Sequence, residues 1–134
     1  MSAVDGSQDL LGAGTSAEGL WQTGCFRSPQ LLAELAPERS ESCRGLAVSV
    51  LHVLVLGKLL SQAISQPMCR YVHLLREAID ASAANECQLA VLVPPATMEH
   101  VEDIAGNLEK MPPKSTYFYP KLLSGLVFNP LKSS

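Results

Sequence analysis

The chain has 134 residues, of which 47% are apolar, and a net charge of −3 with an isoelectric point near 5.5. This length suits one domain, and the apolar content excludes a wholly disordered chain. The sequence has only three Phe, three Tyr and one Trp, so its core must be aliphatic. The acidic balance argues against a general electrostatic surface for nucleic acid, and no specific nucleic-acid partner is expected.

Residues 1–28 differ in composition from the rest of the chain. They hold five of the nine glycines, with Ser, Thr, Asp and Gln between them. Such a segment buries too little apolar surface to offset the entropy lost when its backbone is ordered. We therefore predict a flexible Gly-rich leader over 1–28 and a single domain over 29–134.

The four cysteines give no sign of a metal site or a disulfide framework. Cys25, Cys43, Cys69 and Cys87 form no C-x-x-C pair and have no histidine at zinc-finger spacing, so no metal or other cofactor is expected. The first twenty residues also lack the pattern of a secretory signal peptide. These features predict reduced thiols and a cytoplasmic or nuclear protein.

The next two elements in the chain are expected to be helices. Ser28 followed by Pro29 resembles an N-cap with proline at the first helical position, and Pro37 should end this short helix.

The segment 45–66 is apolar almost all round and has Lys58 as its single charge. We interpret it as a central, buried helix. A membrane-associated segment over 45–66 is the alternative, although a lysine near the centre makes a spanning helix unfavourable.

Two more helices are expected on either side of an ambiguous apolar run. Apolar residues recur at spacings of three and four from Pro67 to Ser82, which predicts a helix with one buried stripe. Thr97 should cap a second helix that Pro112 and Pro113 end. Between them, residues 88–93 are either a buried strand or the last turns of the preceding helix.

A weak internal repeat bears on that ambiguity. A shift of 43 residues aligns 31–50 with 74–93 at seven identical positions, and this period is typical of HEAT-like helix pairs. If the repeat is real, 46–50 and 89–93 share one structure. We predict a mainly α domain of four to five helices; the alternative is an α/β domain in which 46–56 and 88–93 form a short parallel sheet.

Few residues of the chain are suited to catalysis. Cys69 and His73 would share a helix face at positions i and i+4, but a buried thiol beside a solvent-facing histidine explains the same spacing. His100 with Glu99 and Asp103 resembles a metal corner, yet a solvated acidic helix face accounts for it equally simply. No phosphate-binding, nucleophile-elbow or zinc-protease motif occurs. We predict no enzymatic activity.

The tail, residues 112–134, holds most of the aromatic side chains and a cluster of leucines. This cluster is expected to seal a groove or to meet a partner rather than to face water. The leading hypothesis is a protein–protein interaction module or subunit of a larger assembly, whose partner is another protein or a second copy of the chain. The alternatives are a small α/β ligand-binding or degenerate enzyme-like domain and a membrane-associated protein anchored by 45–66. The candidate partner-binding residues are Tyr117, Phe118, Tyr119, Leu122, Leu123, Leu126 and Phe128.

Overall fold

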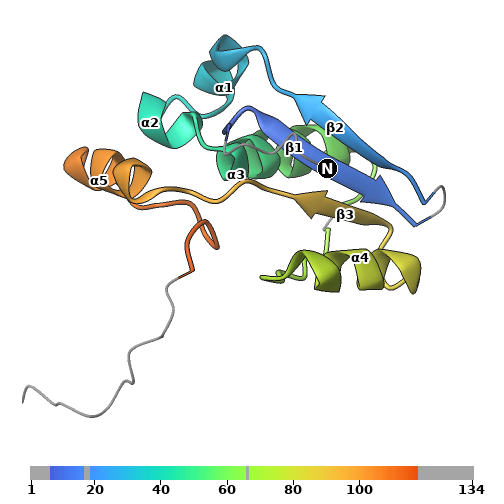
Figure 1. The fold of residues 1–134 in the computed structure, drawn as a ribbon. Helices are drawn as coiled ribbons and strands as arrows, with labels where there is room; N and C mark the ends of the chain where they lie inside the picture. The colour runs from blue at the N-terminus through green and yellow to red at the C-terminus, as the bar shows by residue number, and fades with distance from the viewer. Residues whose placement is uncertain (1–6, 17–18, 66, 118–134) are drawn as a thin grey trace, which may run out of the picture.

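The computed structural model describes residues 7–16, 19–65 and 67–117, and within them the protein is a mixed α/β domain (Figure 1). Five α-helices, a π-helix and a 3₁₀ turn make these residues 42% helical, and an antiparallel three-stranded sheet accounts for a further 14%. The prediction of a mainly α fold is therefore wrong. The α/β alternative fits in part, since residues 88–93 hold a strand, but the sheet is antiparallel and 46–56 is helical.

The sheet is built from strands that lie far apart in the chain. Its order is β2-β1-β3, with β1 at Leu10–Thr15, β2 at Trp21–Cys25 and β3 at Leu89–Leu92. The central strand β1 pairs antiparallel with both neighbours, so that Gly14 lies opposite Trp21 on one side and Ala90 on the other. Residues 10–25, which were expected to belong to a flexible leader, thus supply two of the three strands.

Glycine in β1 is used for close packing rather than for flexibility. A Cβ on Gly14 would lie 2.7 to 3.0 Å from ring atoms of Trp21, so the indole covers the space that a side chain would fill. A Cβ on Gly12 would come within 3.2 Å of the Leu92 Cβ. Gly19, with a φ of +63°, provides the left-handed backbone conformation in the connection between β1 and β2. The composition of this segment predicts disorder, but its glycines accommodate bulky residues from neighbouring strands.

Two short helices follow the hairpin. Helix α1, Pro29–Leu35, begins with proline after Ser28 as predicted and ends before Pro37. Helix α2, Glu41–Arg44, is capped by Ser40, whose hydroxyl accepts a hydrogen bond from the Cys43 N–H at 3.2 Å.

The apolar segment 45–66 is helical, as predicted, but changes its hydrogen-bonding pattern along its length. Helix α3, Ala47–Ser49, continues as a π-helix, η1, Val50–Leu59, and ends in a 3₁₀ turn, η2, Leu60–Gln62. It is buried through Val50 and becomes exposed towards its end. Because 46–50 is helical and β3 is extended, the two copies of the suspected 43-residue repeat do not share a structure.

The helix expected over 67–82 is much shorter than its apolar pattern. Helix α4 spans only Leu75–Ala83 and lies beside β3, with Ala81 and Ser82 buried (Figure 1). Helix α5, Met98–Gly106, is capped by Thr97 as predicted, but it ends before the two prolines. Its C-terminus is instead formed by Asn107 and by Leu108, which has a φ of +55°.

The hydrophobic core is small and lies at one end of the domain. Cys43, Leu46, Val48 and Ile104 form its buried centre and join α2, α3 and α5. Gln8, just before β1, connects the sheet to this core through two hydrogen bonds. Its side-chain oxygen accepts from the Ala47 N–H at 3.1 Å, and its side-chain amide donates to the Pro95 carbonyl at 3.0 Å. Only ten apolar residues among those described are buried, so much apolar surface is left exposed.

Candidate functional site

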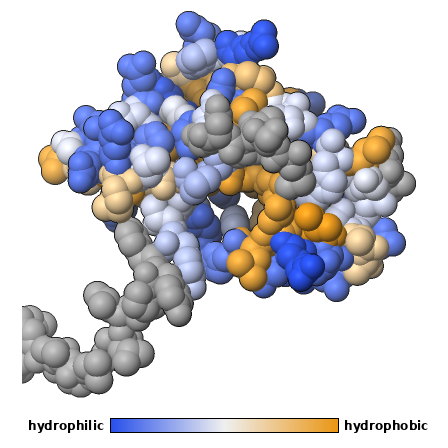
Figure 2. Space-filling view, viewed as in Figure 1, coloured by the Kyte–Doolittle hydropathy of each residue, from blue (hydrophilic) through white to orange (hydrophobic). Residues whose placement is uncertain are grey.

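The most prominent surface feature is a run of exposed apolar side chains before and within α4. Met68 is 99% exposed and Leu74 is 64% exposed, and four neighbours are also open to solvent. We call this set the apolar strip; it consists of Met68, Tyr71, Val72, Leu74, Leu75 and Ile79. Figure 2 shows apolar side chains gathered around α4 on the face that it displays.

Four of the six strip residues, Met68, Tyr71, Val72 and Leu74, are exposed because the backbone before α4 is not helical. Glu77 starts the helix at Leu75, since its carboxylate accepts hydrogen bonds from the backbone N–H groups of His73 at 3.3 Å and Leu74 at 3.2 Å. Residues 67–74 therefore cannot turn their apolar side chains inward as one helical stripe. The sequence pattern predicted a buried face here, whereas the structure exposes most of it.

The first of the candidate partner-binding residues lies next to the strip. The ring centroids of Tyr117 and His73 are 3.9 Å apart, with the planes tilted by 33°. The tail thus reaches the beginning of α4 at Tyr117, which is itself half exposed. The other six candidates, Phe118, Tyr119, Leu122, Leu123, Leu126 and Phe128, lie outside the residues that the structure describes.

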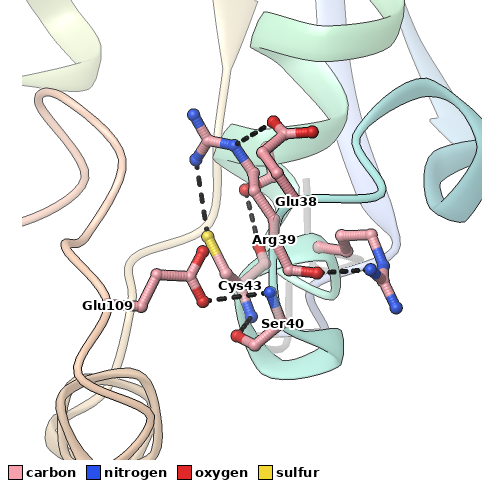
Figure 3. A network of polar contacts seen from close by, with 7 residues as sticks. Glu38, Arg39, Ser40, Cys43 and Glu109 are labelled. Atoms are coloured by element: carbon pink, nitrogen blue, oxygen red, sulfur yellow. Dashed lines mark hydrogen bonds and ion pairs between the residues drawn. The ribbon is translucent and has the colours of Figure 1, made fainter.

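A polar network at the edge of the core, around Cys43, connects α2 to the segment that follows α5 (Figure 3). The Ser40 N–H donates to the Glu109 carboxylate at 3.0 Å, and Arg39 donates to the Cys43 sulfur at 3.5 Å. Figure 3 shows the Cys43 sulfur between the Arg39 guanidinium and the Glu109 carboxylate. Burial raises the pKa of the Cys43 thiol, so Cys43 is a neutral core residue rather than a thiolate nucleophile.

The network also lines a shallow depression, formed by Glu38, Arg39, Leu108, Glu109 and Lys110. Its charged groups interact within the chain, since the Arg39 guanidinium lies 3.7 Å from the Glu38 carboxylate and Glu109 accepts from Ser40. This arrangement fixes α2 against α5, and we assign it a structural role.

We expect Glu109→Gln to destabilise the protein at neutral pH. Hydrogen bonds from Ser40 lower the pKa of Glu109, so its ionised form stabilises the fold above the ordinary carboxylate pKa of about 4.3. This stabilisation disappears as the pH falls through the lowered pKa. Thermal unfolding at pH 7 and at pH 3 should therefore differ less in the variant than in the wild type.

The exposed Glu34 provides a matched control for this charge removal. Glu34→Gln should leave the pH dependence of unfolding unchanged. Equal melting temperatures for wild type and Glu109→Gln at pH 7 would show that the network does not hold α5 in place.

His52 occupies an unusual position in the π-helix. It is partly buried and stacks with Tyr71 of the strip, with ring centroids 6.4 Å apart. Burial lowers its pKa, with a contribution from the Arg39 charge, so the ring is neutral at pH 7. Its Nε2 atom has no hydrogen-bond partner among the described residues.

The candidate catalytic and metal-binding groups are not assembled into a site. Cys69 and His73 lie in non-helical backbone, so the helix face expected to bring them together does not form. His100 caps α5, because its Nδ1 accepts a hydrogen bond from the Thr97 N–H at 3.1 Å. Within residues 7–16, 19–65 and 67–117, no three His, Cys, Asp or Glu side chains are grouped to hold a metal ion.

Neither the helical segment 47–62 nor any other helix in the described part of the chain is long and apolar enough to cross a membrane. All four cysteines are free thiols. Comparisons with family models, curated proteins and solved structures found no match.

The apolar strip was not recognised in the sequence because its spacing is the same as that of a helix that faces the core. The only local sign of irregular backbone was the polar pair 65–66 followed by Pro67.

Proposed function

We propose that the protein is a non-enzymatic interaction module that binds the apolar face of a partner protein through the apolar strip. The observation that carries this proposal is the exposure of six large apolar residues between positions 68 and 79. Single exposed apolar residues are common on protein surfaces, but a set concentrated in one segment is typical of a docking surface.

The strip offers enough apolar surface for moderate affinity. Burying one large apolar side chain fully contributes about 1.5–3 kcal/mol. Met68 and Leu74 are exposed enough to gain most of that value on binding. Even three such residues would supply more than the roughly 4 kcal/mol of a millimolar complex before the costs of association are subtracted.

The surroundings of the strip favour an apolar partner face with a polar rim. Arg70 pairs with Glu86 at 3.0 Å, and Arg76 and Asp80 are exposed on α4. These groups carry both signs of charge, so they do not select a strongly charged ligand. An apolar centre with a mixed polar rim is the usual composition of a protein–protein interface.

The double substitution Met68→Ser and Leu74→Ser is expected to abolish partner capture without weakening the fold. Serine at position 74 precedes α4, where it is a better helix cap than leucine. Quantitative cross-linking and affinity capture from cells should show at least a tenfold loss of the specific partners, which corresponds to about 1.4 kcal/mol.

The chain offers a closely matched control pair. Leu108 is 97% exposed and Leu20 is 61% exposed, close to the values of Met68 and Leu74, and both lie outside the strip. Leu20→Ser with Leu108→Ser should leave partner capture intact. Equal capture by the two double variants would contradict a role for the strip.

A further inference from the structure

We propose that, in the isolated protein, the apolar strip is covered by the chain's own segment 118–128. The segment would dock in cis, starting from Tyr117, and its leucine and aromatic side chains would bury the strip. This inference rests on the strip being a docking surface, as does the proposed function, but it names a different occupant and is tested without any partner.

The point at which the tail meets the domain supports this assignment. Tyr117 is the last residue of the tail that the structure describes, and its ring lies 3.9 Å from that of His73. His73 sits between Val72 and Leu74 of the strip. The following residues therefore begin at the apolar strip rather than at a remote part of the surface.

The length of the segment is sufficient to cover the strip. Helix α4 has nine residues, which at 1.5 Å per residue makes it about 14 Å long. Five residues beyond Tyr117 extend by up to about 17 Å. Leu122 and Leu123 can therefore reach any position along α4, and Phe128 has further length to spare.

The chemistry of the segment matches that of the surface. Residues 118–128 contain no acidic residue and one basic residue, Lys121. The remaining polar groups are few, and the apolar ones are Phe118, Tyr119, Leu122, Leu123, Leu126, Val127 and Phe128. On the opposing side, Glu77 caps α4 and Glu86 pairs with Arg70, which leaves the exposed Asp80 of α4 as the carboxylate that can face the lysine. Apolar contact with one complementary charge favours the tail over a strongly charged ligand.

Covalent connection decides between the chain's own tail and a second copy. A segment attached through a few residues has an effective concentration on the order of millimolar. A second copy present at micromolar concentration competes poorly against it. A protein partner that uses the strip, as we propose above, would have to displace the tail and would bind with correspondingly reduced apparent affinity.

Cys69 provides a reporter inside the strip. Its thiol is exposed between Met68 and Arg70 in the described part of the chain, whereas the exposed Cys25 on β2 serves as an internal control. Alkylation of the full chain by a maleimide, followed by peptide mass spectrometry, gives both rates in one sample. The test variant carries Leu122→Ser, Leu123→Ser and Phe128→Ser; the control variant carries Lys132→Ser.

We expect the triple variant to raise the Cys69 rate about fivefold or more, as it would if the tail covers the strip for at least four-fifths of the time. The Cys25 rate and the circular dichroism spectrum should not change, and Lys132→Ser should behave as wild type. An unchanged Cys69 rate in the triple variant would overturn the inference.

Dilution separates cis docking from self-association. Protection of Cys69 in the wild type should persist over about a hundredfold dilution, because an intramolecular contact does not depend on concentration. Protection that disappears on dilution would assign the strip to a second copy and would overturn the inference. Since neither measurement involves a partner, its outcome is independent of the capture experiment that tests the proposed function.

Discussion

Replacing Ile104 with alanine is expected to remove a large part of the stability of the domain. Ile104 is fully buried against Cys43, Leu46 and Val48, and it anchors α5 to the rest of the protein. Isoleucine-to-alanine changes at such sites cost about 2–5 kcal/mol through lost burial and the cavity that remains. A domain of this size has about 5–15 kcal/mol in total. Chemical denaturation should show a lower midpoint and, at the upper end of this range, loss of the cooperative transition.

Ile79 provides a control of the same chemistry on another helix. It is 37% exposed on α4, so Ile79→Ala removes the same atoms from a site that solvent already reaches. Alanine is also the better helix former, so the stability loss should be clearly smaller than that of Ile104→Ala. Similar losses for both variants would mean that α5 does not dock on the core as described.

Replacing Gly14 with valine is the second substitution for which we expect a large effect. Its first side-chain carbon alone would lie 2.7 to 3.0 Å from the Trp21 ring, so the indole must move away from β1. Overpacking of this kind costs about 1–3 kcal/mol. Trp21 is the single tryptophan of the chain, so its fluorescence should shift towards that of a fully hydrated indole.

Gly24 on the neighbouring strand separates this clash from the general effect of adding a side chain. The nearest atom to a Cβ at Gly24 is 3.9 Å away, which is ordinary contact distance. Gly24→Val should leave tryptophan emission unchanged and could stabilise β2, because valine favours extended backbone. An unshifted emission spectrum in Gly14→Val would argue against the pairing of β1 with β2.

Local signals in the sequence located several elements correctly. Ser28 with Pro29 marked the start of α1, and Thr97 marked the start of α5, because helix caps depend on residues that are neighbours in the chain. The helical nature of 47–62 also followed from its length and from the lack of a turn signal.

The sheet could not be predicted in the same way. Composition alone predicted disorder for the first strands, because Gly12 and Gly14 contribute no buried side chain of their own. Their role depends on Trp21 and Leu92, and the latter arrives from a distant part of the chain. Strand β3 remained ambiguous for the same reason, since its only sheet neighbour among the described strands is β1.

The main feature of the candidate site, the apolar strip, was not predicted. The tail was expected to seal a groove or meet a partner, and that stays a prediction; of its candidate residues the structure describes only Tyr117, whose ring lies beside that of His73. The strip followed a helical spacing, but a cap at Glu77 starts α4 too late for Met68 to Leu74 to face inward. Periodicity predicts which residues would share a face, whereas the position of the cap decides whether the helix exists there.

The position of β1 has a consequence for how the protein forms during synthesis. The central strand is made before its two neighbours, yet one of its edges is paired only when β3 emerges, after α1 to α4 have been synthesised. Until then the free edge of β1 in the β1–β2 hairpin has unpaired backbone N–H and C=O groups, and these can form hydrogen bonds with strands of other chains. Closing so long a loop is also slow compared with forming local helices. The nascent chain is thus most prone to aggregation during the interval between completion of β2 and arrival of β3.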